Sequence, residues 1–106
     1  MSKTNTFTTE GVLDETNIIL FGVSCSSYVN LDPPNVPPSG DLRVTIRDSA
    51  TADDSGTILC RFVLNAQGGL QSVTFPAGVR ITEGVAVNID NSTDPHEDIV
   101  VVLDYA

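Results

Sequence analysis

Apolar and polar side chains alternate at every second position over several stretches of the chain, and turn-forming residues separate these stretches. Alternation of this period is typical of antiparallel strands that bury one face. We expect the apolar side chains of these stretches to face one hydrophobic core, with Arg43, Arg47 and Arg61 on the opposite faces of their strands. The apolar positions are Leu42, Val44 and Ile46; Ile58, Cys60, Phe62 and Leu64; Val79, Ile81, Val85, Val87 and Ile89; and Ile99, Val101, Leu103 and Tyr105.

Two segments near the beginning of the chain extend this pattern. Residues 18–29 are rich in β-branched and aromatic types with interspersed glycine and serine, which predicts one long strand packed closely against a neighbour. Residues 4–12 alternate weakly, and we expect them to form an edge strand or an arm. No window has apolar residues at helical spacing after a capping box, so helix should be nearly absent.

These elements predict an all-β protein, an antiparallel β-sandwich of jelly-roll or immunoglobulin-like type with about six to eight strands. Residues 1–106 form a single domain in this interpretation, with residues 1–10 as a possible extended N-terminal arm. Turns are expected at residues 53–56 and 76–78. The Gln-Gly-Gly sequence at 67–69 lies between two apolar runs and predicts a hairpin.

The longest break in the pattern, residues 31–40, contains Pro33, Pro34, Pro37 and Pro38. Proline removes backbone donors and favours an extended polyproline-like chain. The segment predicts a stiff connection between two sheets. The alternative is a loop presented to a partner, and these prolines together with Phe7 are the candidate partner-binding residues.

Charge narrows the classes of partner. The 14 acidic residues outnumber the 5 basic ones and give a formal net charge of −9, which disfavours nucleic acids and anionic membrane surfaces. This charge promotes solubility, or provides a surface that meets a basic partner. The chain has no apolar stretch long enough for a transmembrane helix, and its first residues do not resemble a secretory signal.

Candidate catalytic and metal-binding groups are few. His96 is the single histidine, and no nucleophile elbow accompanies it, so we expect a solvated loop residue and no enzyme activity. Paired carboxylates could form in the fold, but the chain has no Trp to provide a platform for sugars. Acidic residues at 48–54 and 90–98 lack calcium-loop spacing, so we expect solvated turns there, with a weak surface cation site as the alternative. No cofactor is predicted.

Cys25 and Cys60 both lie in apolar runs. Without a secretory signal we expect free, buried thiols, and a disulfide remains the alternative if their strands are neighbours. Two thiols and one histidine do not complete a zinc site.

The last third of the chain has a pattern that resembles a known group of proteins. Residues 73–89 contain an apolar-Pro-x-Gly-Val turn, a short strand, a polar pair ending in Gly and a strand of alternating Val and Asn; residues 98–105 form a Val-rich strand ending in Tyr. This pattern resembles the C-terminal half of small β-sandwich structural proteins of tailed bacteriophages and related prophages. Similarity is weaker over residues 58–70, and none is found before residue 29.

The resemblance implies a non-enzymatic virion component, namely a capsid decoration or accessory protein on the particle exterior, assembled in the bacterial host cytoplasm. Its implied partners are the major capsid protein or other virion proteins and copies of itself, with a trimer favoured. Sheet edges that must be covered fit such association. The alternative is a carbohydrate or receptor-binding module of a tail or knob, in which loops 32–40 and 90–98 would contact the ligand.

Overall fold

The structure, a computed structural model, describes residues 2–28, 41–53, 55–64, 68–90 and 97–106. This part of the chain contains eight strands and no helix, as the sequence predicts. In chain order the strands are β1 (Lys3–Phe7), β2 (Gly11–Leu13), β3 (Ile18–Tyr28), β4 (Leu42–Asp48), β5 (Thr57–Leu64), β6 (Gly69–Ile81), β7 (Val85–Asp90) and β8 (Glu97–Tyr105).

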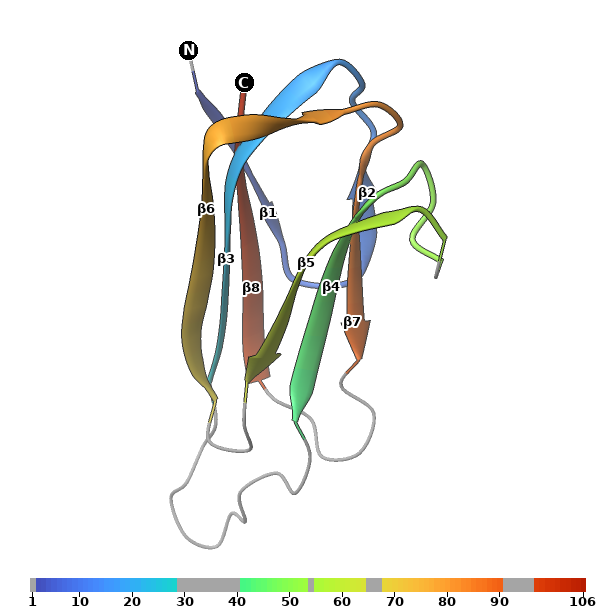
Figure 1. The fold of residues 1–106 in the computed structure, drawn as a ribbon. Coiled ribbons are helices and arrows are strands. Elements are labelled where there is room, and N and C mark those ends of the chain that lie inside the picture. The colour runs from blue at the N-terminus through green and yellow to red at the C-terminus, as the bar shows by residue number, and fades with distance from the viewer. Residues whose placement is uncertain (1, 29–40, 54, 65–67, 91–96) are drawn as a thin grey trace, which may run out of the picture.

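The strands form two four-stranded antiparallel sheets that pack face to face, which confirms the predicted β-sandwich (Figure 1). The order is β1-β8-β3-β6 in the first sheet and β2-β7-β4-β5 in the second. Consecutive strands often lie in different sheets, so the chain crosses between the layers repeatedly. The described residues contain no helix long and apolar enough to span a membrane.

The core lies between the two sheets and follows the predicted alternation closely in β4, β7 and β8. Each buried aliphatic side chain contributes about 1.5–3 kcal/mol relative to an exposed one. The largest fully buried side chains are Leu20, Leu42, Ile46, Ile81, Leu103, Val44, Val85, Val87, Val101 and Cys25. The long strand predicted over residues 18–29 is confirmed as β3, which supplies Leu20 and Cys25 to this core.

The N-terminal segment belongs to both sheets. β1 pairs with β8 at the edge of the first sheet, and β2 pairs with β7 at the edge of the second. Phe7, the last residue of β1, is half-buried and packs against the core, and a Cβ added to Gly11 would lie 3.0 Å from its ring. Residues 3–7 therefore form an edge strand, which is one of the two alternatives predicted for this segment.

One predicted core position in β5 is wrong. The register of β4 and β5 shifts after Ile46, so Cys60 lies opposite Ile46 whereas Ile58 lies opposite Arg47. Leu59 packs against the core instead, and Ile58 faces outward with 44% of its surface exposed. A single inserted residue turns a strand by one position and exchanges its faces.

Two predicted turns are also wrong. The hairpin at residues 67–69 does not form, because β5 pairs with β4 and β6 pairs with β3 in the other sheet. Residues 76–78 lie inside β6, where Leu20 pairs with Val79 and Gly22 pairs with Thr74, leaving residues 75–78 opposite a single position of β3. β6 bends sharply at the top of the sandwich in Figure 1 and crosses towards β7.

Candidate functional site

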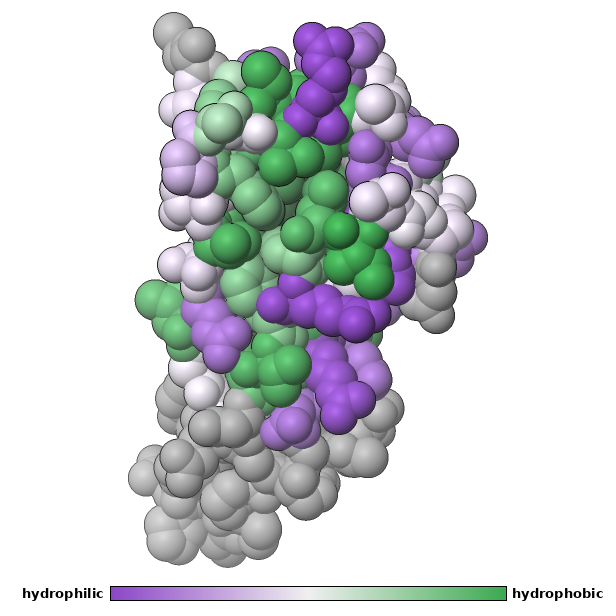
Figure 2. All heavy atoms as spheres, viewed as in Figure 1, coloured by the Kyte–Doolittle hydropathy of each residue, from purple (hydrophilic) through white to green (hydrophobic). Residues whose placement is uncertain are grey.

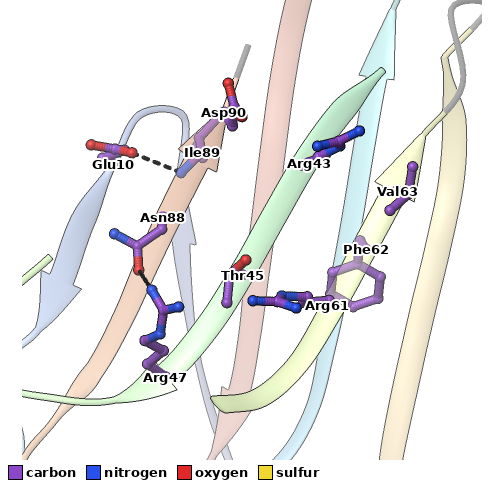
Figure 3. A pocket seen from close by; sticks show the side chains of 10 residues that line it. All are labelled: Glu10, Arg43, Thr45, Arg47, Arg61, Phe62, Val63, Asn88, Ile89 and Asp90. Atoms are coloured by element: carbon purple, nitrogen blue, oxygen red, sulfur yellow. Dashed lines mark hydrogen bonds between the residues drawn. The ribbon is translucent and has the colours of Figure 1, made fainter. Parts of the chain in front are cut away.

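The outer surface of the second sheet has an open depression of about 890 Å³ (Figure 3). Three of the chain's five basic residues line it, although the chain as a whole is strongly acidic. The lining residues are Glu10, Arg43, Thr45, Arg47, Arg61, Phe62, Val63, Asn88, Ile89 and Asp90. Sequence alternation predicted that the arginines lie outside the core, but it did not indicate that they share one surface.

Strand pairing brings these side chains together. Thr45 of β4 lies directly opposite Arg61 of β5 on one side and Asn88 of β7 on the other. Arg43 lies one outward-facing position away on β4, opposite Val63. Side chains opposite or diagonal on one sheet face are within about 4.5–8 Å at their Cβ atoms. We call Arg43, Thr45, Arg47, Arg61 and Asn88 the arginine face.

Arg47 differs from the other two arginines because it is buried, with 8% of its surface exposed. Its Nη1 donates a hydrogen bond to Asn88 Oδ1 at 3.2 Å, and Asn88 Nδ2 donates to the Ala52 carbonyl at 2.8 Å. Asn88 thus joins the guanidinium to the segment that connects β4 and β5. Arg43 and Arg61 remain exposed.

Asp48, at the end of β4, has a structural role. Its carboxylate accepts hydrogen bonds from the backbone N–H groups of Thr82 (3.1 Å), Glu83 (2.9 Å) and Gly84 (3.4 Å), and from Thr82 Oγ1 (3.0 Å). Burial raises the pKa of Asp48, but these hydrogen bonds outweigh that effect and lower the pKa below its usual value. The acidic cluster at 48–54 therefore begins with a carboxylate that already has four donors.

The carboxylates of Glu10 and Glu15 also stabilise the fold. Glu10 Oε1 accepts a hydrogen bond from the Ile89 backbone at 2.9 Å, and Glu15 Oε2 accepts one from the Tyr105 hydroxyl at 2.8 Å. The bond to Glu15 raises the pKa of Tyr105. Within the described ranges, no three His, Cys, Asp or Glu residues form a cluster able to hold a metal ion.

Both cysteines are free thiols, as predicted. Cys25 is buried in the core and Cys60 is half-buried in β5. Burial raises the pKa of each thiol to about 11, so neither is a nucleophile at neutral pH.

The side of the sandwich between β5 and β6 is open. β5 and β6 are the outermost strands of their sheets, and neither has a strand partner on its outer edge within the described chain. Gln71 Nε2 of β6 donates to the Val63 carbonyl of β5 at 2.8 Å and bridges the opening. Figure 2 shows a band of apolar side chains along this side. Partly or largely exposed apolar residues on the two strands are Ile58, Leu59, Val63, Leu70, Val73, Phe75 and Val79.

No protein-family model matches this chain, and no curated protein matches it.

The candidate partner-binding residues differ in where they lie. Phe7 contacts the core of its own chain, as described above. Pro33, Pro34, Pro37 and Pro38 lie outside the described residues, and so does His96. Sequence reasoning missed the arginine face, because only strand order shows that β4, β5 and β7 are neighbours.

Proposed function

We propose that this chain is a non-enzymatic structural protein of a tailed-phage virion, a capsid decoration or accessory protein on the particle exterior. It acts by associating with copies of itself, with a trimer favoured, and with the major capsid protein. The resemblance of residues 73–89 and 98–105 to such proteins motivates the proposal. The β-sandwich fold is compatible with it.

One observation carries the assembly part of this proposal: the open side formed by β5 and β6. Residues 69–79 of β6 contain no charged side chain, although the whole chain is 18% charged. Natural edge strands are usually blocked by charges, bulges or covering segments, because free backbone groups invite pairing with another chain. Here the bulge at 75–78 protects one part of β6, whereas residues 69–74 before it pair regularly with β3 and carry no charge.

Leu70 strengthens this argument, because 72% of its surface is exposed in the isolated chain. An exposed apolar side chain beside an unpaired edge is stabilised when a second subunit covers it. A trimer requires a heterologous contact, in which the β6 edge of one copy meets a different surface of the next copy, and the unpaired edge of β5 provides such a surface. We therefore expect self-association through β6 and the neighbouring surface of β5.

The test is the solution mass by light scattering, measured alone and with intact capsids of the source phage. A trimer or larger species that co-sediments stoichiometrically with capsids supports the proposal. The variant Leu70→Lys should shift the mass towards the monomer, whereas Thr16→Lys, the same charge change at an exposed position outside the strands, should leave it unchanged. A monomer that ignores capsids and retains a specific glycan instead favours the receptor-binding alternative.

A further inference from the structure

The arginine face is an unusual arrangement for a chain with a formal net charge of −9. Arg43 and Arg61 are exposed, and no hydrogen bond or salt bridge joins either of them to another described residue. Two carboxylates border the face: Glu10 accepts a hydrogen bond from the Ile89 backbone N–H, and exposed Asp90 lies opposite Arg43 at the end of β7. The fold thus gathers three arginines on one face, and among the described residues no carboxylate forms a salt bridge with Arg43 or Arg61.

The spacing of the Arg43 and Arg61 positions on the sheet matches that of alternate residues in an extended chain. Arg43 and Arg61 are diagonal neighbours on one face, because Arg43 pairs with Val63 and Arg61 pairs with Thr45. Diagonal positions are roughly 7–8 Å apart. Alternate side chains of an extended peptide are separated by about 6.6–6.8 Å. Carboxylates at every second residue of such a peptide would therefore reach both arginines.

The other residues on this surface favour a polypeptide over other kinds of anionic ligand. Arginine binds carboxylates through two parallel hydrogen bonds, and Thr45 and Asn88 add neutral polar groups between the strands. Val63, which is 47% exposed, and Ile58 lie on the same outer face of β5 and offer apolar contact. A long polyanion such as nucleic acid extends beyond this face and meets the repulsion of the surrounding acidic surface, whereas a short acidic segment contacts the arginines alone.

We propose that the arginine face binds an acidic polypeptide segment in extended conformation, with alternate Asp or Glu carboxylates paired to Arg43 and Arg61. Arg47 adds a fixed positive charge, because Asn88 and burial restrict its side chain. The arginine face lies on the outer surface of the second sheet and adjoins, at Val63 of β5, the open side used for self-association in the proposed function. It gives the protein a second contact surface, specific for an acidic segment of a partner.

Isothermal titration calorimetry with a defined probe tests this inference. The probe is a capped hexapeptide, Asp-Thr-Asp-Thr-Asp-Thr, and the controls are its Asn-Thr counterpart and heparin. We expect the acidic peptide to bind at low salt, the neutral peptide not to bind, and added salt to weaken the interaction. The double variant R43Q/R61Q should bind about tenfold more weakly, the result of losing two exposed charge-assisted contacts.

The matched control is the double variant K3Q/R80Q, which removes the same two charges from exposed positions on the first sheet. At an ionic strength of about 0.1 M it should bind the peptide within about twofold of the unchanged chain, because exposed charges more than about 10 Å from the site are largely screened. The inference is overturned by absent binding, by equal losses in both double variants, or by heparin binding as tightly as the peptide. Light scattering on the same samples shows whether self-association is retained, so failure of this site is distinguishable from failure of the assembly proposal.

Discussion

The Asp48 carboxylate accepts two hydrogen bonds from Thr82, one from its backbone N–H at 3.1 Å and one from its hydroxyl at 3.0 Å. Asp48 ends a strand of the second sheet, whereas Thr82 follows the last residue of β6 in the first sheet. This pair therefore fixes the point where the chain crosses from one sheet to the other. Ser49 reinforces the junction, because its N–H donates to the Gly84 carbonyl at 3.0 Å.

Replacing Asp48 with Asn should lower the free energy of unfolding by about 1–3 kcal/mol, since hydrogen bonds to a charged acceptor are stronger than those to a neutral amide. Urea unfolding at neutral pH measures the change. Asp41→Asn, at an exposed position before β4, is the control and should change stability by less than about 0.5 kcal/mol.

The same carboxylate predicts a pH dependence. The pKa of Asp48 is lower in the folded chain than in the unfolded one, where it is about 3.9. Its contribution is therefore present above the unfolded pKa and is lost as the pH falls through the folded value. Unfolding curves between neutral pH and pH ~2 should show a smaller loss of stability for Asp48→Asn than for the unchanged chain. Parallel losses would show that other carboxylates dominate.

Gly84→Ala should destabilise the fold more than Gly69→Ala. Both glycines have positive φ, 153° and 131°, so both changes strain the backbone, at a cost of about 1–3 kcal/mol each. A Cβ added at Gly84 would lie 2.9 Å from the Ser49 carbonyl oxygen and 3.1 Å from the Leu13 carbonyl oxygen. A Cβ added at Gly69 would have no described atom within 4 Å. Because both variants carry the backbone strain, the difference between their melting temperatures measures the cost of the close contacts at Gly84. Equal melting temperatures would contradict this prediction.

Phe7→Ala should lower stability by about 1–3 kcal/mol in the isolated chain, because half-buried Phe7 packs against the core and the ring lies beside Gly11. Thr6→Ala, at the exposed neighbouring position of β1, should have little effect. Chemical unfolding without any partner provides the measurement. If Phe7→Ala were neutral alone yet reduced capsid binding, the residue would serve the partner rather than the fold.

Both thiols should react slowly with a disulfide reagent at pH 8 in the folded protein and rapidly after unfolding. Their folded pKa of about 11 leaves only about one part in a thousand as thiolate, compared with an unfolded pKa of about 8.5. The single variants Cys25→Ser and Cys60→Ser allow the two rates to be compared. Because the folded pKa values are raised, stability should decrease as the pH increases above the unfolded value.

The alternation of apolar and polar residues predicted much of this fold. It was sufficient by itself to assign Leu42, Val44 and Ile46 to the core. Features that depend on a distant strand could not be predicted in this way. Ile58 changes face because of a bulge against β4, and the Gln-Gly-Gly segment fails as a hairpin because the preferred partners of its flanking strands are elsewhere. The burial of Arg47 likewise depends on Asn88, 41 residues further along the chain.

The pairing of β1 with β8 has a practical consequence. Lys3 lies opposite Tyr105, so the two ends of the described chain leave the sandwich side by side (Figure 1). A short linker could join them into a covalent ring without disturbing either strand. New ends could then be opened in a surface loop, giving a circular permutant in which every strand keeps its neighbours while their order along the chain changes.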